Sequence, residues 1–244
     1  MPALPAGPPV PSTDAGPVVA GVRLRPAVAL AIALTVLCVL SIGCSGYAVY
    51  ADWTTWTLME RLVSDPGAVG DGELARGESL FLLASSVQTR ALILAGVVFI
   101  IWFHLVRGNA RVFAQDVDTL ASGVAAGARA AAPAGLWLPY RIAATTWVSS
   151  SPLGADEGSR RFPLTLVNVW WGAFAAARVL GWCGGMAYSL AQSPGAVRLA
   201  ATTMLVGDVL DIVAAVLAPL FVIRLTAMQR TRSAQRPTAA AVRP

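Results

Sequence analysis

The chain has 244 residues, of which 56% are hydrophobic and 13% are charged, and its formal net charge is +5. A soluble domain has about a quarter of its residues charged, so this composition, with a mean hydropathy of +0.65, excludes an ordinary water-soluble fold. The arginines are spread over the ends of apolar segments rather than gathered on one basic surface, which argues against a nucleic-acid partner. We expect the lipid bilayer, with anionic headgroups, to be the partner.

The predicted domain organisation follows from where the apolar sequence begins and ends. Residues 1–26 are rich in Pro, Ala and Gly, so they cannot bury a core and are expected to be disordered. Residues 27–229 are predicted to form one membrane domain, and residues 230–244 a basic disordered tail. The sequence therefore predicts one membrane unit with an unstructured segment at each end.

Four mostly apolar stretches divide the membrane domain, at residues 27–50, 81–103, 164–190 and 199–223. A helix rises about 1.5 Å per residue, so each stretch is long enough to cross a hydrocarbon core of roughly 30 Å. The predicted fold class is all-α, a polytopic membrane protein with four transmembrane helices. Residues 51–80, which carry more carboxylates than arginines, are predicted to form an acidic outer loop.

The distribution of arginines predicts the orientation. Arginines concentrate before residue 27, between residues 104 and 163, and after residue 223, whereas only Arg61, Arg76 and Arg198 flank the other ends of the spans. Positive residues in short connections stay on the cytoplasmic side. We therefore expect a multi-pass protein of the plasma membrane with both termini in the cytoplasm.

The connection between the second and third spans does not resemble a simple loop. Trp137, Tyr140 and Trp147 are interleaved with Arg141 there, and aromatic residues beside arginine are typical of a membrane interface. Pro139 predicts a fixed bend before Tyr140. Residues 125–138 are too short to span unaided and are interrupted by Arg129 and Pro133. Residues 119–147 are therefore expected either to lie on the membrane surface or to re-enter the membrane.

A family resemblance rests on four runs: VVFIIWFHLVRGNARVF, GLWLPYRIAATTWVSSSP, VNVWW and IVAAVLAPLFVIRLTAMQ. Over residues 95–229 the chain resembles the actinobacterial membrane family known as domain of unknown function 4328, and LWLPYR at residues 136–141 is the most specific part of the likeness. The resemblance implies a multi-pass membrane protein and implies no activity.

Charged residues inside the spans form the most pointed feature. Arg178 lies ten residues from Tyr188, at the outer end of the third span, and Asp208 lies ten residues beyond Arg198, so both lie about 15 Å deep. A short turn at residues 193–195 makes the two helices antiparallel, and this places Arg178 level with Asp208 and Asp211. The pattern predicts an intramembrane charge cluster of Arg178, Asp208 and Asp211. Arg90 either is a fourth member of this cluster or extends its side chain outward.

Small residues accompany this cluster. Ala173, Ala177, Gly181 and Gly185 recur every four residues in the third span, and Gly207 lies beside Asp208 in the fourth. Such spacing lets helix backbones approach closely, so a tight hairpin of the third and fourth spans is expected. The cluster is either a neutral structural clamp or, with one carboxylate in excess, a site for a proton or cation.

No catalytic motif indicates an enzyme. His104 is the only histidine, and Cys38, Cys44 and Cys183 lack the spacing of metal ligands, so we expect neither catalytic residues nor a metal or other cofactor. The leading interpretation is a structural or interaction component of the cell envelope, with a further copy of the chain or another envelope protein as partner. The alternative is an ion- or proton-coupled transport or channel component that uses Arg178, Asp208 and Asp211.

Overall fold

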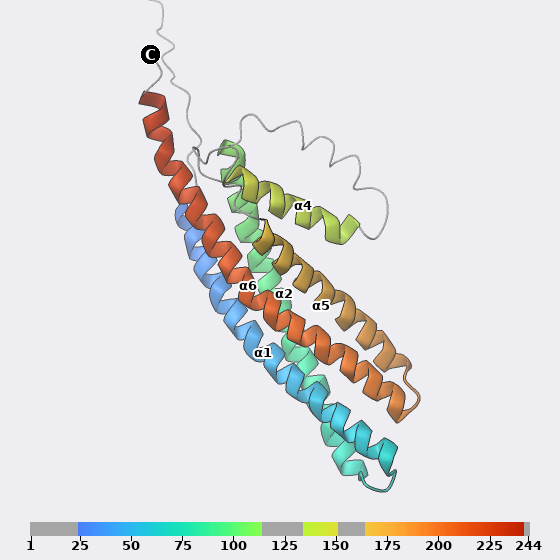
Figure 1. Cartoon of the computed structure of the whole chain (residues 1–244). Coiled ribbons are helices and arrows are strands. Elements are labelled where there is room, and N and C mark those ends of the chain that lie inside the picture. The colour runs from blue at the N-terminus through green and yellow to red at the C-terminus, as the bar shows by residue number, and fades with distance from the viewer. Residues whose placement is uncertain (1–23, 114–133, 151–163, 242–244) are drawn as a thin grey trace, which may run out of the picture.

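The computed structural model describes residues 24–113, 134–150 and 164–241, and every element in these ranges is a helix. The helices are α1 (Leu24–Ser64), α2 (Asp71–Phe113), α4 (Ala134–Ser149), α5 (Thr165–Leu190) and α6 (Pro194–Ala241) (Figure 1). The predicted all-α class is therefore confirmed for the described part of the chain. Residues 1–23 of the predicted N-terminal segment and residues 119–133 of the predicted interfacial segment lie outside it.

Three of these helices are long and apolar enough to cross a membrane, over Ala27–Ser64, Asp71–Gly108 and Pro194–Thr231. Helix α5 is not among them, because Asn168, Arg178 and several Trp and Gly residues lower its hydropathy. The prediction of a basic unstructured tail from residue 230 is wrong over most of its length, since the backbone of α6 stays helical to Ala241. Arg, Gln and Ala, which recur in that segment, are good helix formers.

The predicted outer loop at residues 51–80 is instead the tip of a helical hairpin. Only residues 65–70 separate α1 from α2. The charged residues on either side of this connection belong to the two helices and not to a loop. Arg61 Nη1 lies 2.5 Å from Glu73 Oε1, and Arg61 Nη2 donates a hydrogen bond of 2.8 Å to the Ala68 carbonyl. These contacts hold the hairpin end together and extend α1 well beyond the predicted first span.

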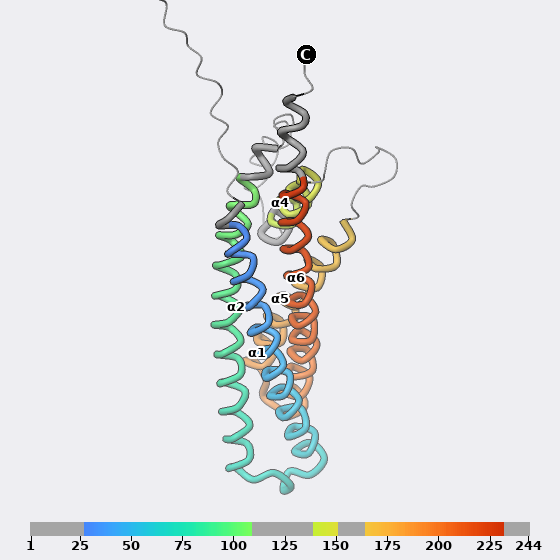
Figure 2. The backbone as a smooth tube through the Cα atoms, turned by 90° about the vertical axis from the view of Figure 1, so that its left-hand side faces the viewer, coloured from blue at the N-terminus to red at the C-terminus, as the bar shows by residue number. Residues whose placement is uncertain are grey.

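The long helices pack side by side in the order α2, α1, α6, α5 (Figures 1 and 2). Helices α2 and α5 are not a closely packed pair, and two pairs of aromatic rings bridge them. Phe81 and Tyr188 stack with centroids 4.7 Å apart near one end, and Phe99 and Trp170 lie 5.4 Å apart toward the other. The middle of the bundle is therefore enclosed by four helices but loosely closed between α2 and α5.

Helices α5 and α6 form a close hairpin, as the small residues predict. A Cβ atom on Gly207 would lie 3.3 Å from the Gly181 nitrogen, and one on Gly184 would lie 2.7 Å from Met204 Cγ. Ala177 is also buried at this contact. The close backbone approach holds the polar side chains of α5 and α6 within reach of each other. We call the end of the bundle with the α1–α2 and α5–α6 connections the loop end.

An aromatic core fills the bundle toward the opposite end. Phe221 of α6 stacks on Trp170 of α5 with centroids 4.9 Å apart and on Trp147 of α4 at 5.6 Å, and Trp102 of α2 meets its edge at 6.1 Å. Trp102, Trp147 and Phe221 are almost completely buried. Ring pairs at these separations favour a single packing arrangement, so four helices are fixed together here.

Helix α4 lies at the end of the bundle opposite the loop end, where it contacts α2 and α5 (Figure 1). Pro139 does not bend the chain out of the helix but lies inside α4. Trp147, predicted to belong to the interfacial segment, does not face outward, since this face of α4 packs inward and buries the indole in the aromatic core. Tyr140 and Arg141 remain partly exposed, and Trp137 lies in the first turn of the helix.

Tyr140 is expected to help hold α4 in place. Its hydroxyl donates a hydrogen bond of 2.8 Å to Asn168 Oδ1 on α5. Because this bond is exposed, Tyr140→Phe is expected to destabilise the docked helix by only about 0.5 kcal/mol. Faster amide hydrogen exchange in α4, with unchanged exchange in α1, would reveal this loss; equal exchange in both proteins would mean that the aromatic core alone docks α4.

Candidate functional site

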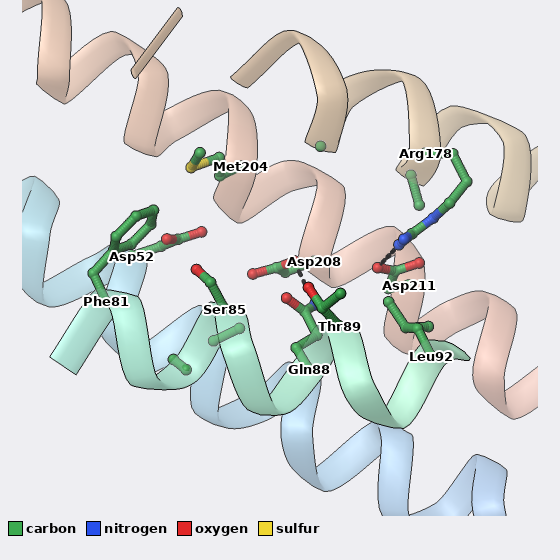
Figure 3. Close-up of a pocket in the computed structure, with 14 residues that line it drawn as sticks. Asp52, Phe81, Ser85, Gln88, Thr89, Leu92, Arg178, Met204, Asp208 and Asp211 are labelled. Carbon is green, nitrogen blue, oxygen red and sulfur yellow. Dashed lines mark hydrogen bonds and ion pairs between the residues drawn. The ribbon is translucent and has the colours of Figure 1, made fainter. Parts of the chain in front are cut away.

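A polar pocket of about 250 Å³ lies in the middle of the bundle, and we call it the central pocket (Figure 3). Helices α1, α2, α5 and α6 all contribute to its wall. Its polar lining consists of Asp52, Ser85, Gln88, Thr89, Arg178, Asp208 and Asp211. A cavity of this size holds several waters when polar groups are present to bind them, so the pocket is suited to a small hydrated ligand.

Arg178 and Asp211 form an ion pair between α5 and α6. The Asp211 side chain is 4% exposed, whereas that of Arg178 is 36% exposed, so the carboxylate is the more deeply buried partner. The guanidinium also lies over the Phe174 ring, 5.8 Å from its centroid. The close backbone approach at Gly207 brings these two helices near enough for this pair to form.

Asp208 lies in the same pocket, but its hydrogen-bond partner comes from a different helix. Gln88 Nε2 of α2 donates a hydrogen bond of 2.7 Å to Asp208 Oδ1 and also reaches Ser45 Oγ of α1 at 3.4 Å. Asp208 and Asp211 are three residues apart and share one face of α6. In Figure 3 the two carboxylates point to different helices, so the three predicted residues share one pocket without forming one closed triad.

Asp52 is a member of the site that reasoning from the sequence missed. Its residue is 3% exposed, and among the described residues no hydrogen-bond partner reaches its Oδ2 atom. Its carboxyl group points into the central pocket, which the Asp208 carboxyl group also enters (Figure 3). Two carboxyl groups can bond to each other only if one of them holds a proton.

A signal for Asp52 was present in the sequence. Ser41, Ser45, Ala48, Asp52 and Thr55 recur at spacings of three and four residues and are all buried on one face of α1. Because Asp52 carries a charge, the predicted span ended before it, at residue 50. The continuing helical period of small and polar residues indicates that the buried face does not end there.

Arg90 is not a member of the pocket. Its residue is exposed, and it does not contribute to the pocket wall. Arg90 follows Gln88 by two residues, which is about 200° around a helix, so it lies on the opposite side of α2 from the pocket. The predicted inclusion of Arg90 in the charge cluster is therefore corrected, and the alternative of an outward side chain agrees with the structure.

The charges in the central pocket do not balance. Three carboxyl groups face one guanidinium group, so complete ionisation would leave two excess negative charges inside the bundle. Charges in a low-dielectric interior are costly unless they are paired. Within the described ranges, no three His, Cys, Asp or Glu side chains converge as metal ligands. The excess of carboxyl groups favours bound positive charge in this pocket, to which both Asp52 and Asp208 contribute.

The family model described as a domain of unknown function, DUF4328, matches residues 65–227. The chain belongs to this family. The DUF4328 match includes Gln88, Arg178, Asp208 and Asp211, whereas Asp52 lies before it on α1. No curated protein and no solved structure matches the chain.

Proposed function

We propose that the chain is an integral protein of the plasma membrane with four transmembrane helices. Helix α5 supplies the fourth, because its 26 residues extend to ~39 Å at about 1.5 Å per residue and exceed a core of roughly 30 Å. Helix α4 then lies at the membrane interface. The arginine distribution supports an orientation with the loop end outside the cell and both termini in the cytoplasm.

The proposed function is proton binding inside the membrane, as a proton-coupled transport or channel component. The observation that carries it is Asp52, a buried carboxyl group that faces Asp208 without a donor for its Oδ2 atom. A proton shared by the two groups supplies the missing donor and removes one excess negative charge, as in other paired carboxyl sites. Arg178 neutralises Asp211, so the proton belongs to the pair and not to Asp211.

The environment of this proton site comes from every helix around the central pocket. The groups that face it are Asp52 from α1, Ser85 and Gln88 from α2, Arg178 from α5, and Asp208 and Asp211 from α6. Gln88 donates a hydrogen bond to Asp208, whereas Asp52 Oδ2 has no such donor among the described residues, so a proton held by Asp52 completes the hydrogen bonding of the pocket.

Infrared spectroscopy of the reconstituted protein tests this function. We expect a protonated-carboxyl band at neutral pH that disappears in Asp52→Asn and persists in Asp71→Asn, whose carboxylate is exposed at the start of α2. Proton flux in proteoliposomes is expected to fall to the level of empty vesicles in Asp52→Asn alone. A wild-type protein without the band, or with a band that Asp52→Asn leaves unchanged, contradicts the proposal.

A structural role in the cell envelope, without catalysis, is the second candidate function. The ion pairs of Arg178 with Asp211 and of Arg198 with Glu60 tie α6 to two neighbouring helices and suit a rigid scaffold for a further copy of the chain or another envelope protein. Anionic lipids are its proposed neighbours at the arginine-rich end. Under this alternative, Asp52→Asn leaves the carboxyl band unchanged and increases thermal stability, because it removes an uncompensated buried charge.

A further inference from the structure

A second cavity lies between the central pocket and the loop end. It has a volume of about 260 Å³, and its wall includes Thr55 of α1, Glu78 of α2, Tyr188 of α5 and Val197 of α6. We call it the loop-end cavity. Glu78 is exposed, so the cavity reaches the surface of the molecule and has a carboxylate at its mouth.

The two cavities are stacked along the bundle. On α1 the wall passes from Asp52 in the central pocket to Thr55 in the loop-end cavity, and on α6 it passes from Met204 to Val197. Each step moves toward the loop end by one to two helical turns. The cavities are therefore neighbours and lie one beyond the other on the way from the loop end to Asp52.

A stacked pair of aromatic rings connects the walls of the two cavities. Phe81 belongs to the wall of the central pocket and Tyr188 to that of the loop-end cavity, and the two rings stack with centroids 4.7 Å apart and planes at 24°. Because α2 and α5 are not a closely packed pair, rotation of one side chain separates the rings without moving a helix. In the other direction, the buried side chains of Trp102 and Phe221 fill the bundle.

We propose that the proton site is reached by water and cations from the loop end only, through the loop-end cavity, and that Phe81 and Tyr188 form the gate. This inference rests on the proposed function, because it supplies the access route to that site. Glu78 at the mouth and the excess carboxylates beyond the gate select positive charge over negative. The aromatic core closes the opposite side, so exchange across the whole membrane requires a further rearrangement there.

Cysteine accessibility in the full chain tests the route. In a variant with Cys38, Cys44 and Cys183 replaced by Ala, and shown to keep its thermal stability, Ser85→Cys places one thiol in the central pocket. The probes are a membrane-impermeant cationic methanethiosulfonate and its anionic counterpart, applied to either side of sealed vesicles. Gly67→Cys in the α1–α2 connection marks the loop-end side, and Ile93→Cys, at an exposed position on α2, is the lipid-facing control.

The expected result has three parts. Ser85→Cys reacts from the same side as Gly67→Cys, the cationic reagent reacts about tenfold faster than the anionic one, and Phe81→Ala increases the rate severalfold. Tyr188→Ala gives the same increase if Phe81→Ala does not fold. Ile93→Cys stays unreactive toward both reagents.

Three other outcomes overturn the route. They are reaction from the opposite side, equal rates for the two reagents, and reaction of Ser85→Cys only with a membrane-permeant maleimide, which would mean a lateral opening between α2 and α5. None of them removes the protonated-carboxyl band of the Asp52 and Asp208 pair. The access route therefore fails separately from proton binding.

Discussion

Replacing Arg178 with glutamine is expected to lower the free energy of unfolding in lipid nanodiscs by about 3 kcal/mol. The substitution leaves Asp211 in the bundle without its guanidinium partner, and loss of one member of a buried ion pair costs about 3 to 5 kcal/mol. The lower end of this energy range applies because the Arg178 side chain is 36% exposed, although that of Asp211 is only 4% exposed. Thermal unfolding followed by circular dichroism measures the loss.

A double substitution separates the ion pair from the packing of the arginine side chain. Asp211→Asn in the Arg178→Gln background is expected to recover more than half of the lost stability, since it removes the unpaired charge. Arg61→Gln is the matched control, because the Arg61 and Glu73 side chains are 49% and 41% exposed and such pairs contribute at most about 1 kcal/mol. Equal losses for Arg178→Gln and Arg61→Gln would show that the central pocket is not a low-dielectric site.

The part of the site on α5 and α6 was predictable because it depends on helix geometry alone. Depth along two antiparallel helices and a short connection place Arg178 level with Asp208 and Asp211, and no knowledge of tertiary packing is needed. The contributions of α1 and α2 depend on which face each helix turns inward. Asp52 was missed since a charge after an apolar stretch is equally typical of the end of a span. Gln88 was missed since it lies in the polar run SSVQTR of residues 85–90, whose side chains are spread around the helix and mark no single inward face.

The difference between helix geometry and the choice of the inward face also explains the result for α4. Aromatic residues beside arginine indicate a membrane interface, and the place of α4 at the end of the bundle opposite the loop end (Figure 1) agrees with that prediction. The sequence does not reveal which of the aromatic residues turns inward. Trp147 does so because Phe221 presents an aromatic surface to it, and this complementarity exists only once α6 has been placed.

Replacing Gly184 with leucine is expected to destabilise the protein by about 2 kcal/mol, the second of the large effects. A Cβ atom there would lie 2.7 Å from Met204 Cγ, 3.2 Å from the Met204 nitrogen and 3.4 Å from the Ala200 carbonyl oxygen. Overpacking of this kind costs about 1 to 3 kcal/mol, and the larger Leu side chain adds to it. Replacement of Gly within a helix recovers nearly 1 kcal/mol of helix propensity, so the net effect stays a loss.

Gly172→Leu on the same helix is the matched control, because a Cβ atom at Gly172 has no neighbour within 4 Å. It changes helix propensity in the same way without a steric clash, so unchanged or slightly increased stability is expected. Separation of α5 from α6 by Gly184→Leu also moves Arg178 away from Asp211, and the two substitutions Gly184→Leu and Arg178→Gln should therefore be less than additive. Full additivity would contradict the view that close approach of the two backbones is what allows the ion pair to form.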